Sequence, residues 1–249
     1  MIDLNGFLAI PFSYKGKCKI YPPTVRQTLS DEMFPQYRRL LTISQEELED
    51  EFTRAAKGNL KETVPSVYDY LFINIKQDKR FAAVAKKAFE FFLHEEVNFL
   101  PEPKMVVIGS LEKEIKKAKS VEKLRLIKED EFLEFQNAVR RSLGDKPLEP
   151  PNPNEHPRIK AMKAKARYRD YIKAKKGLGI DFGTLLASIC CMNMGLNPLN
   201  IGEISYASVK VLVDTYQEKE KYETEVRSLQ AGADPKKIKP KYWIRQLDN

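Results

Sequence analysis

The chain has 249 residues, of which 42% are hydrophobic and 31% charged, so it is long and apolar enough to bury a core and is not disordered throughout. It carries a net charge of +8 and three cysteines, too few for a disulfide framework. No stretch approaches the roughly 18 apolar residues of a membrane span, and the start lacks the basic segment of a secretory signal, so we expect a cytoplasmic protein.

The excess positive charge is concentrated in one predicted helix, residues 157–177. This segment contains nine basic residues against Asp170 alone, so its charge accounts for the whole +8 and the remainder of the chain is formally neutral. Its basic residues are Arg158, Lys160, Lys163, Lys165, Arg167, Arg169, Lys173, Lys175 and Lys176.

The first twenty residues predict a β-hairpin. Apolar side chains alternate on both sides of a tight turn at Lys15-Gly16, at Leu8, Ile10 and Phe12 before it and at Cys18 and Ile20 after it. Pro22-Pro23 then ends the strand, and Thr24 is a helix N-cap.

Helices are predicted to follow, starting at a capping box at Ser44 and at Pro65-Ser66. Residues 81–93 carry a broad aromatic stripe at helical spacing and predict the main core helix. Residues 100–108 predict a strand that pairs antiparallel with residues 124–127 across an extended lysine-rich connection, and a helix over 131–142 ends at Gly144.

Five prolines within residues 145–157 exclude a helix there and predict a stiff linker. We therefore expect an N-terminal α+β domain over 1–144, a Pro-rich linker over 145–157, and the basic helix with a C-terminal helical region over 158–249. In that region Asp181 opens a helix over 182–194 that Gly195 closes, and a long helix over 205–231 stops at Gly232. The predicted class is mainly α (α+β), a helical bundle-like protein with an N-terminal hairpin and a second short two-stranded ribbon.

No residue pattern indicates catalysis, a metal site or a cofactor. The chain has two histidines and no C-x-x-C, and neither His94, at a predicted helix end, nor His156, in the linker, lies in a catalytic motif. The glycines of residues 177–183 match neither the dinucleotide fingerprint nor the Walker pattern, and serve better as a helix stop and a joint. We therefore expect a protein that is not an enzyme.

The helix over 182–194 is apolar and ends in cysteine and methionine. Such residues usually act as adaptable core packing, and the alternative is a Met-rich groove for a partner helix. On that alternative, the candidate contacts are Leu186, Ile189, Met192, Met194, Tyr206 and Val213.

The basic helix has three interpretations. Its cations could neutralise the phosphates of a nucleic acid, with Tyr168 and Tyr171 stacking on bases, or contact an acidic protein, or form a solvated tether between domains. No base-reading motif accompanies it. Acidic runs such as 46–51 are expected to be solvated helix faces.

Several segments together resemble a family of tailed-bacteriophage morphogenesis proteins encoded with tail genes. The similar segments are residues 19–25 (KIYPPTV), 40–46 (LLTISQE), 132–137 (FLEFQN), 195–201 (GLNPLNI), 217–222 (QEKEKY) and 239–244 (KPKYWI). The resemblance implies a tail-assembly chaperone, a mainly helical protein that keeps a tape-measure protein soluble while the tail tube assembles. The chain is long for such proteins and adds the basic helix.

The resemblance and the residue patterns together predict a non-enzymatic phage tail assembly factor that binds a helical tape-measure-type partner in the bacterial host cytoplasm. The alternatives are a phage nucleic-acid-binding accessory protein that uses the basic helix, and a structural virion component. The sequence leaves a homo-oligomer open.

Overall fold

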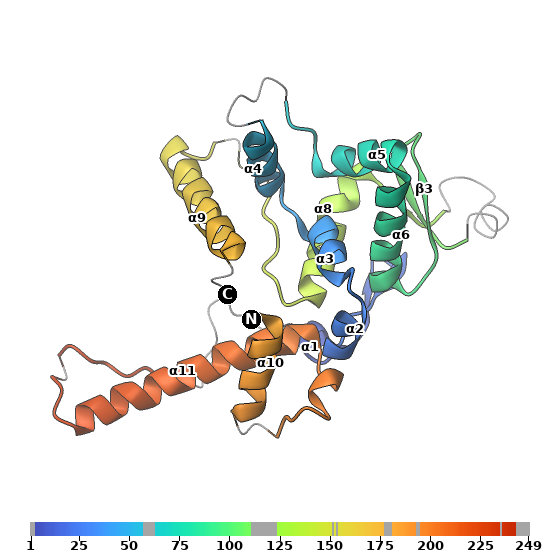
Figure 1. The fold of residues 1–249 in the computed structure, drawn as a ribbon. Helices are drawn as coiled ribbons and strands as arrows, with labels where there is room; N and C mark the ends of the chain where they lie inside the picture. The colour runs from blue at the N-terminus through green and yellow to red at the C-terminus, as the bar shows by residue number, and fades with distance from the viewer. Residues whose placement is uncertain are drawn as a thin grey trace.

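The computed structural model describes residues 3–56, 63–110, 124–150, 152, 154–176, 181–192, 195–234 and 236–242. Figure 1 shows how its elements are arranged. In chain order they are α1 (Leu4–Phe7), β1 (Phe12–Tyr14), β2 (Cys18–Ile20), α2 (Val25–Ser30), α3 (Phe34–Thr42), α4 (Gln45–Ala55), α5 (Val67–Gln77), α6 (Lys79–Leu93), β3 (Val97–Leu100), β4 (Met105–Ile108), β5 (Leu126–Ile127), α8 (Glu129–Ser142), α9 (Pro157–Lys175), α10 (Phe182–Cys191), the 3-10 turn η2 (Ile201–Glu203) and α11 (Tyr206–Gln230).

The protein is mainly α, with two small antiparallel sheets, which confirms the predicted class. One sheet is the hairpin β1–β2 and the other has the order β3–β4–β5. None of the helices within the described ranges has both the length and the apolar composition needed to cross a membrane.

The N-terminal hairpin is confirmed, but its first strand begins later than predicted. Phe12 pairs with Ile20 and Tyr14 with Cys18, and Lys15 and Gly16 form the turn with φ of 48° and 69°. Leu8 instead ends α1, whose N-cap Asp3 accepts from two backbone amides, and Ile10 donates its N–H to Asn5 within the same segment. The strand pattern at Leu8 and Ile10 was therefore wrong, since local capping bonds occupy the backbone there.

The second sheet has three strands where the sequence predicted two. The pairing of β4 with β5 is confirmed, with Val106 opposite Ile127. The strand predicted over 100–108 is confirmed at Met105–Ile108, which is β4, but its first part was wrong. Pro101 and Pro103 lack the N–H that a ladder requires, so the chain turns there, and Leu100 ends β3, which pairs back on β4. The predicted extended connection lies mostly outside the described residues.

The main core lies between α3, α5, α6, α8 and the two sheets. Helix α6 supplies its aromatic stripe as predicted, and Phe89 stacks on Phe135 of α8 with ring centroids 5.2 Å apart. Tyr14 of the hairpin meets the edge of Phe135 at 5.6 Å, so this side chain joins the hairpin to the helices. Both phenylalanines are fully buried, and burial of such a side chain contributes roughly 1.5–3 kcal/mol.

Most predicted helix starts are confirmed by their caps. Thr24 and Ser44 each form a complete capping box, and Ser66 accepts from the Asp69 N–H at the start of α5. At the other ends, Gly144 and Gly232 adopt the positive φ that follows a helix.

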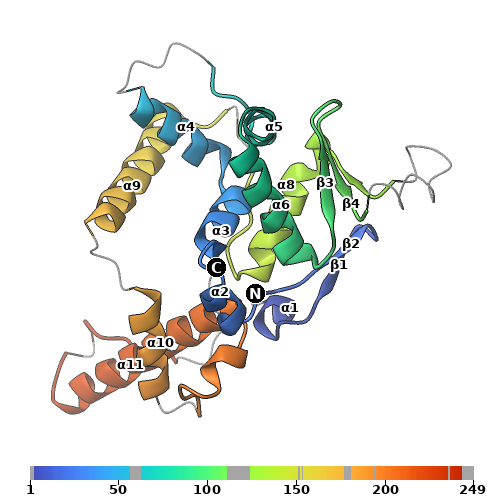
Figure 2. The same cartoon turned by 45° about the vertical axis from the view of Figure 1, so that its right-hand side comes forward.

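The C-terminal helices pack on the start of the chain. Val25, Leu186, Ile189, Ile201 and Val209 form a second buried group, here called the C-terminal cluster, to which α2 contributes Val25. The Val25 N–H donates to Ile204 O at 2.9 Å, and the Tyr206 N–H donates to Pro23 O at 2.8 Å. Helix α11 then projects from the body as an arm (Figures 1 and 2). The division into two domains stays a prediction.

Candidate functional site

Helix α10 packs its apolar face inward, onto α2 and α11. Asp181 caps it by accepting from the Thr184 N–H at 2.9 Å, as predicted. Leu186 and Ile189, two of the predicted partner contacts, are 8% and 0% exposed within the C-terminal cluster. A partner would reach them only if α10 moved away from α2 and α11, so their contact with a partner remains a prediction.

The other four predicted partner contacts differ in how far they are buried. Met192 and Val213 are half-buried against the C-terminal cluster, and Met194 lies outside the described residues. Tyr206 lies between Phe34 and Phe182, with ring centroids 5.3 and 5.2 Å away, and its hydroxyl accepts from Arg38 at 3.1 Å. Burial raises the pKa of Tyr206 above its ordinary value. The structure thus gives five of the six an internal packing role, wholly or in part.

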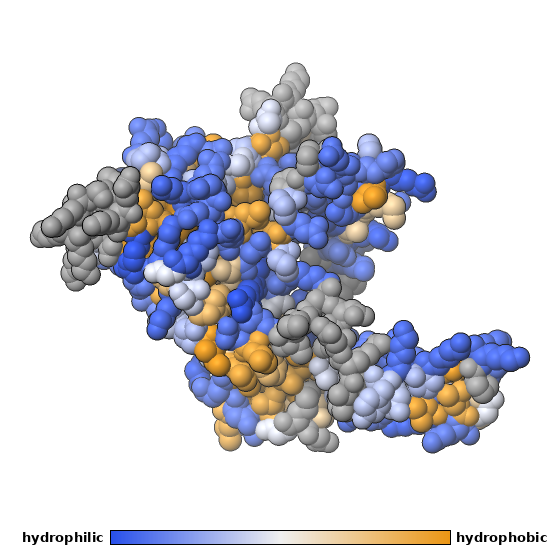
Figure 3. All heavy atoms as spheres, turned by 180° about the vertical axis from the view of Figure 1, so that it is seen from behind, coloured by the Kyte–Doolittle hydropathy of each residue, from blue (hydrophilic) through white to orange (hydrophobic). Residues whose placement is uncertain are grey.

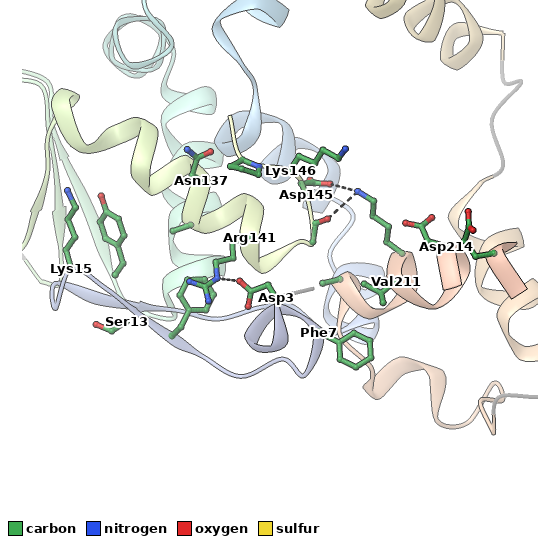
Figure 4. Close-up of a pocket in the computed structure, with 18 of the residues that line it drawn as sticks. Asp3, Phe7, Ser13, Lys15, Asn137, Arg141, Asp145, Lys146, Val211 and Asp214 are labelled. Atoms are coloured by element: carbon green, nitrogen blue, oxygen red, sulfur yellow. Dashed lines mark hydrogen bonds and ion pairs between the residues drawn. The ribbon is translucent and has the colours of Figure 1, made fainter. Parts of the chain in front are cut away.

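A surface hollow of about 840 Å³ lies between α8 and α11 and is closed on one side by α1 and the hairpin. We call it the α8–α11 groove (Figure 4). Phe7, Phe12, Ala138, Ala207 and Val211 supply its apolar lining. The sequence did not predict this groove, because its walls come from segments as far apart in the chain as Asp3 and Glu218.

Small residues bring the walls of the groove together at one end. A Cβ on Gly6 would lie 2.7 Å from the Arg141 carbonyl oxygen, and a Cβ on Gly144 would lie 3.1 Å from the Ala207 Cβ. The hydroxyls of Ser205 and Ser208 both donate to Phe7 O, which ties α1 to the start of α11. Glycine at 6 and 144 is therefore a packing requirement, and Gly144 also needs its φ of 68°.

Charged side chains surround the apolar lining as pairs. Asp145 accepts from Arg38 at 3.0 Å, and Lys210 of α11 lies 3.9 Å from the other Asp145 oxygen. Arg141 forms an ion pair with Asp3 while its guanidinium lies 4.8 Å from the centroid of the Phe12 ring. Figure 4 shows the pairs of Asp3 with Arg141 and of Asp145 with Lys210, each of which bridges separate elements, so these charges fix the walls of the groove.

An apolar lining with a rim of both charges suits the recognition of a polypeptide. Ligand sites usually combine apolar walls with a few polar groups that fix orientation, and helix-binding grooves follow the same rule. One continuous face of α11 lines the groove, because its lining residues follow the helical i, i+3, i+4, i+7 and i+11 pattern: Ala207, Lys210, Val211, Asp214 and Glu218.

Helix α9 lies beside α4 in both views of the ribbon (Figures 1 and 2). Arg167 forms ion pairs with Glu46 and with Asp50, the latter at 2.6 Å, and Lys160 lies 3.9 Å from Glu49. The acidic run of α4, expected to be solvated, is thus the partner of the basic helix. No described side chain of α9 is buried, so charge rather than apolar packing holds it.

His94 and Cys18 both have structural surroundings. His94 adopts the left-handed conformation at the end of α6, as its predicted helix-end position suggested, and its ring stacks on Tyr21 at 4.1 Å. Burial lowers the pKa of His94 and raises the pKa of the Cys18 thiol to about 12. Across the described part of the chain, no three His, Cys, Asp or Glu side chains gather as a metal site would require.

No model of a known protein family matches the chain, and no curated protein and no solved structure matches it either. The geometry of the groove and of α9, with the sequence motifs, is therefore the basis for a functional assignment.

Proposed function

We propose that the protein is a non-enzymatic assembly factor that binds an amphipathic helix of a partner along the α8–α11 groove. The observation that carries this is the continuous α11 face, which starts at Ala207 in the groove and runs through Val211 and Asp214 toward the arm. A partner helix laid along α11 would contact this face over several turns. Its apolar side would meet Phe7, Phe12 and Val211, and its polar side would meet the charged rim.

The resemblance of six segments to phage tail morphogenesis proteins supports a partner of the tape-measure type. Such a partner exposes long amphipathic helices before the tail closes around it, and exposed apolar surface of that size promotes aggregation. Covering one helix in a groove would keep it soluble in the host cytoplasm. The proposal needs no reactive centre.

Apolar surface continues beyond the groove. Seen from behind, hydrophobic side chains gather at the root of the arm and toward its far end (Figure 3). Leu4, Leu8 and Ile10, around α1, are 65%, 57% and 47% exposed. Because α1 forms one wall of the groove, a long partner helix could extend onto this surface.

Co-expression tests the proposal. A tape-measure protein from a tail gene cluster is produced alone, with this protein, or with a groove variant, and its soluble fraction is measured. Val211→Arg places a charge in the apolar lining, and Thr224→Arg adds the same charge to an exposed position of α11 outside it. We expect the wild type and Thr224→Arg to raise the soluble fraction and Val211→Arg to lose most of the gain.

Two results would contradict the proposal in different ways. No gain with the wild type would refute the chaperone role, whereas an equal gain with Val211→Arg would refute the groove as the site. Analysis of purified phage particles tests the third alternative, a structural virion component. Such a component is retained in the particles, whereas an assembly factor is absent from them.

A further inference from the structure

All the cations of residues 158–176 except Lys175 lie on two opposite faces of α9 and its last turn. Lys160, Lys163 and Arg167 point toward the body, where their partners are Glu49, Glu155, and Glu46 with Asp50. On the opposite face, at spacings of seven, four, four and three residues, lies a set that we call the outer stripe: Arg158, Lys165, Arg169, Lys173 and Lys176. All five are exposed, and none has an ion pair with any residue that the structure describes.

The outer stripe is unfavourable for the isolated chain. It spans roughly 27 Å at 1.5 Å per residue, and its central cations repeat about every 6 Å, within the Debye length of about 8 Å at physiological salt. Like charges four residues apart destabilise a helix by about 0.2–0.5 kcal/mol per pair. Asp170, the one carboxylate of α9, is three residues from Lys173 and can offset the repulsion only at that end of the stripe. A polyanion would relieve it along the whole stripe.

We propose that the outer stripe binds the phosphate backbone of a nucleic acid, independently of the helix-binding function above. The stripe contains no carboxylate, and Met162 is the apolar residue within it. Protein interfaces depend on a buried apolar centre from which charges are depleted, whereas phosphate contacts need only cations at the surface. The stripe therefore fits a nucleic acid better than an acidic protein, and its contacts would be independent of base sequence.

The ion pairs of Lys160, Lys163 and Arg167, on the side of α9 that we call the inner face, explain why the outer stripe faces solvent. Because Arg167 is held by two carboxylates of α4 and the ring of Tyr171 lies 4.5 Å from the Arg54 guanidinium, the helix is fixed with its other side toward solvent. The intramolecular pairs thus use three cations and leave the five of the outer stripe for a ligand.

A fluorescent mixed-sequence duplex DNA of about 20 base pairs tests the proposal over a salt series with the full chain. Five phosphate contacts predict a slope of log K against log salt of about −4.5, or an affinity loss of about 500-fold between 50 and 200 mM salt. Lys165→Gln/Lys173→Gln should reduce the slope to about −2.7. The matched control, Lys160→Gln/Lys163→Gln, removes the same charge from the inner face and should leave the slope unchanged. Circular dichroism confirms that each variant keeps its helix.

Three results would overturn the proposal. The first is an absence of salt-dependent DNA binding by the wild type. The second is an equal loss of DNA affinity and salt slope in the two double variants, which would reflect net charge alone. The third is tighter binding of a poly-glutamate peptide than of the DNA at the same salt, which would assign the stripe to an acidic protein. Because the groove variants leave the stripe intact, failure here and failure of the helix-binding function are distinguishable.

Discussion

Replacement of Ile189 by alanine tests whether α10 is an internal helix or an exposed binding helix. The side chain is 0% exposed and packs in the C-terminal cluster, which has five buried members. Removing three carbon groups costs about 2.4 kcal/mol at about 0.8 kcal/mol per group, and a cavity that the neighbours do not fill adds to this. We expect Ile189→Ala to lower the free energy of unfolding by about 2.5–4 kcal/mol.

Urea denaturation followed by circular dichroism measures this loss. Ser188→Ala, one residue away on the exposed side of α10, is the control and should change the free energy of unfolding by less than about 0.5 kcal/mol. A loss below about 1 kcal/mol for Ile189→Ala, with the helix content retained, would show that this side chain is not enclosed. The reasoning would then fail, and Ile189 would again be a candidate surface contact.

Three further changes probe the main body. Ser44→Ala removes the capping box of α4 and should cost about 1 kcal/mol in urea denaturation, and an unchanged midpoint would contradict the cap. Tyr68→Phe should cost about 1 kcal/mol in the same assay, because it removes the hydroxyl whose single proton is donated to Lys104 O, at 2.6 Å, or to Ile127 O, at 3.2 Å. Burial alone would raise the pKa of Glu131, but the hydrogen bond from Lys17 and the charges of Lys17 and Lys15 outweigh it and lower the pKa. Its stabilising effect is therefore complete above the unfolded pKa of about 4.3 and is lost as pH falls through the lower folded value, so melting temperatures of wild type and Glu131→Gln should converge in acid. A constant difference would refute this.

Local backbone chemistry made much of the fold predictable. Thr24, Ser44, Ser66 and Asp181 were assigned as helix starts because a side-chain oxygen can satisfy the first free amides of the helix, and each makes that bond. Such signals act over three residues and do not depend on the tertiary structure. The aromatic stripe of α6 was predictable for the same reason, since its spacing defines one face.

Features that depend on distant segments were not predictable in the same way. The apolar pattern of α10 identified a face to be covered but not the two helices that cover it, α11 and α2, the second of which lies about 160 residues earlier in the chain. The groove depends on the contact of Gly6 and Gly144 with Ala207. From the sequence alone, a glycine at a helix end such as Gly144 indicates only where the helix stops, so this contact was not predicted. Strand β3 was not predicted either, because the turn at Pro101 and Pro103 separates it from its partner β4 and interrupts the alternating apolar pattern of a strand.

The basic helix combines both kinds of information. The spacing of its cations already separates two faces, since residues 158, 165, 169, 173 and 176 return to one side at 3.6 residues per turn. Which face points inward depends on the acidic run of α4, about 110 residues away, and on Arg167 pairing with two of its carboxylates. The formal charge of +8 therefore overstates the positive charge of α9 that is free to contact a ligand. If α9 were a solvated tether instead, the cations on both of its faces would be equally available to a ligand. Unequal effects of inner-face and outer-face substitutions on DNA binding follow from this arrangement alone.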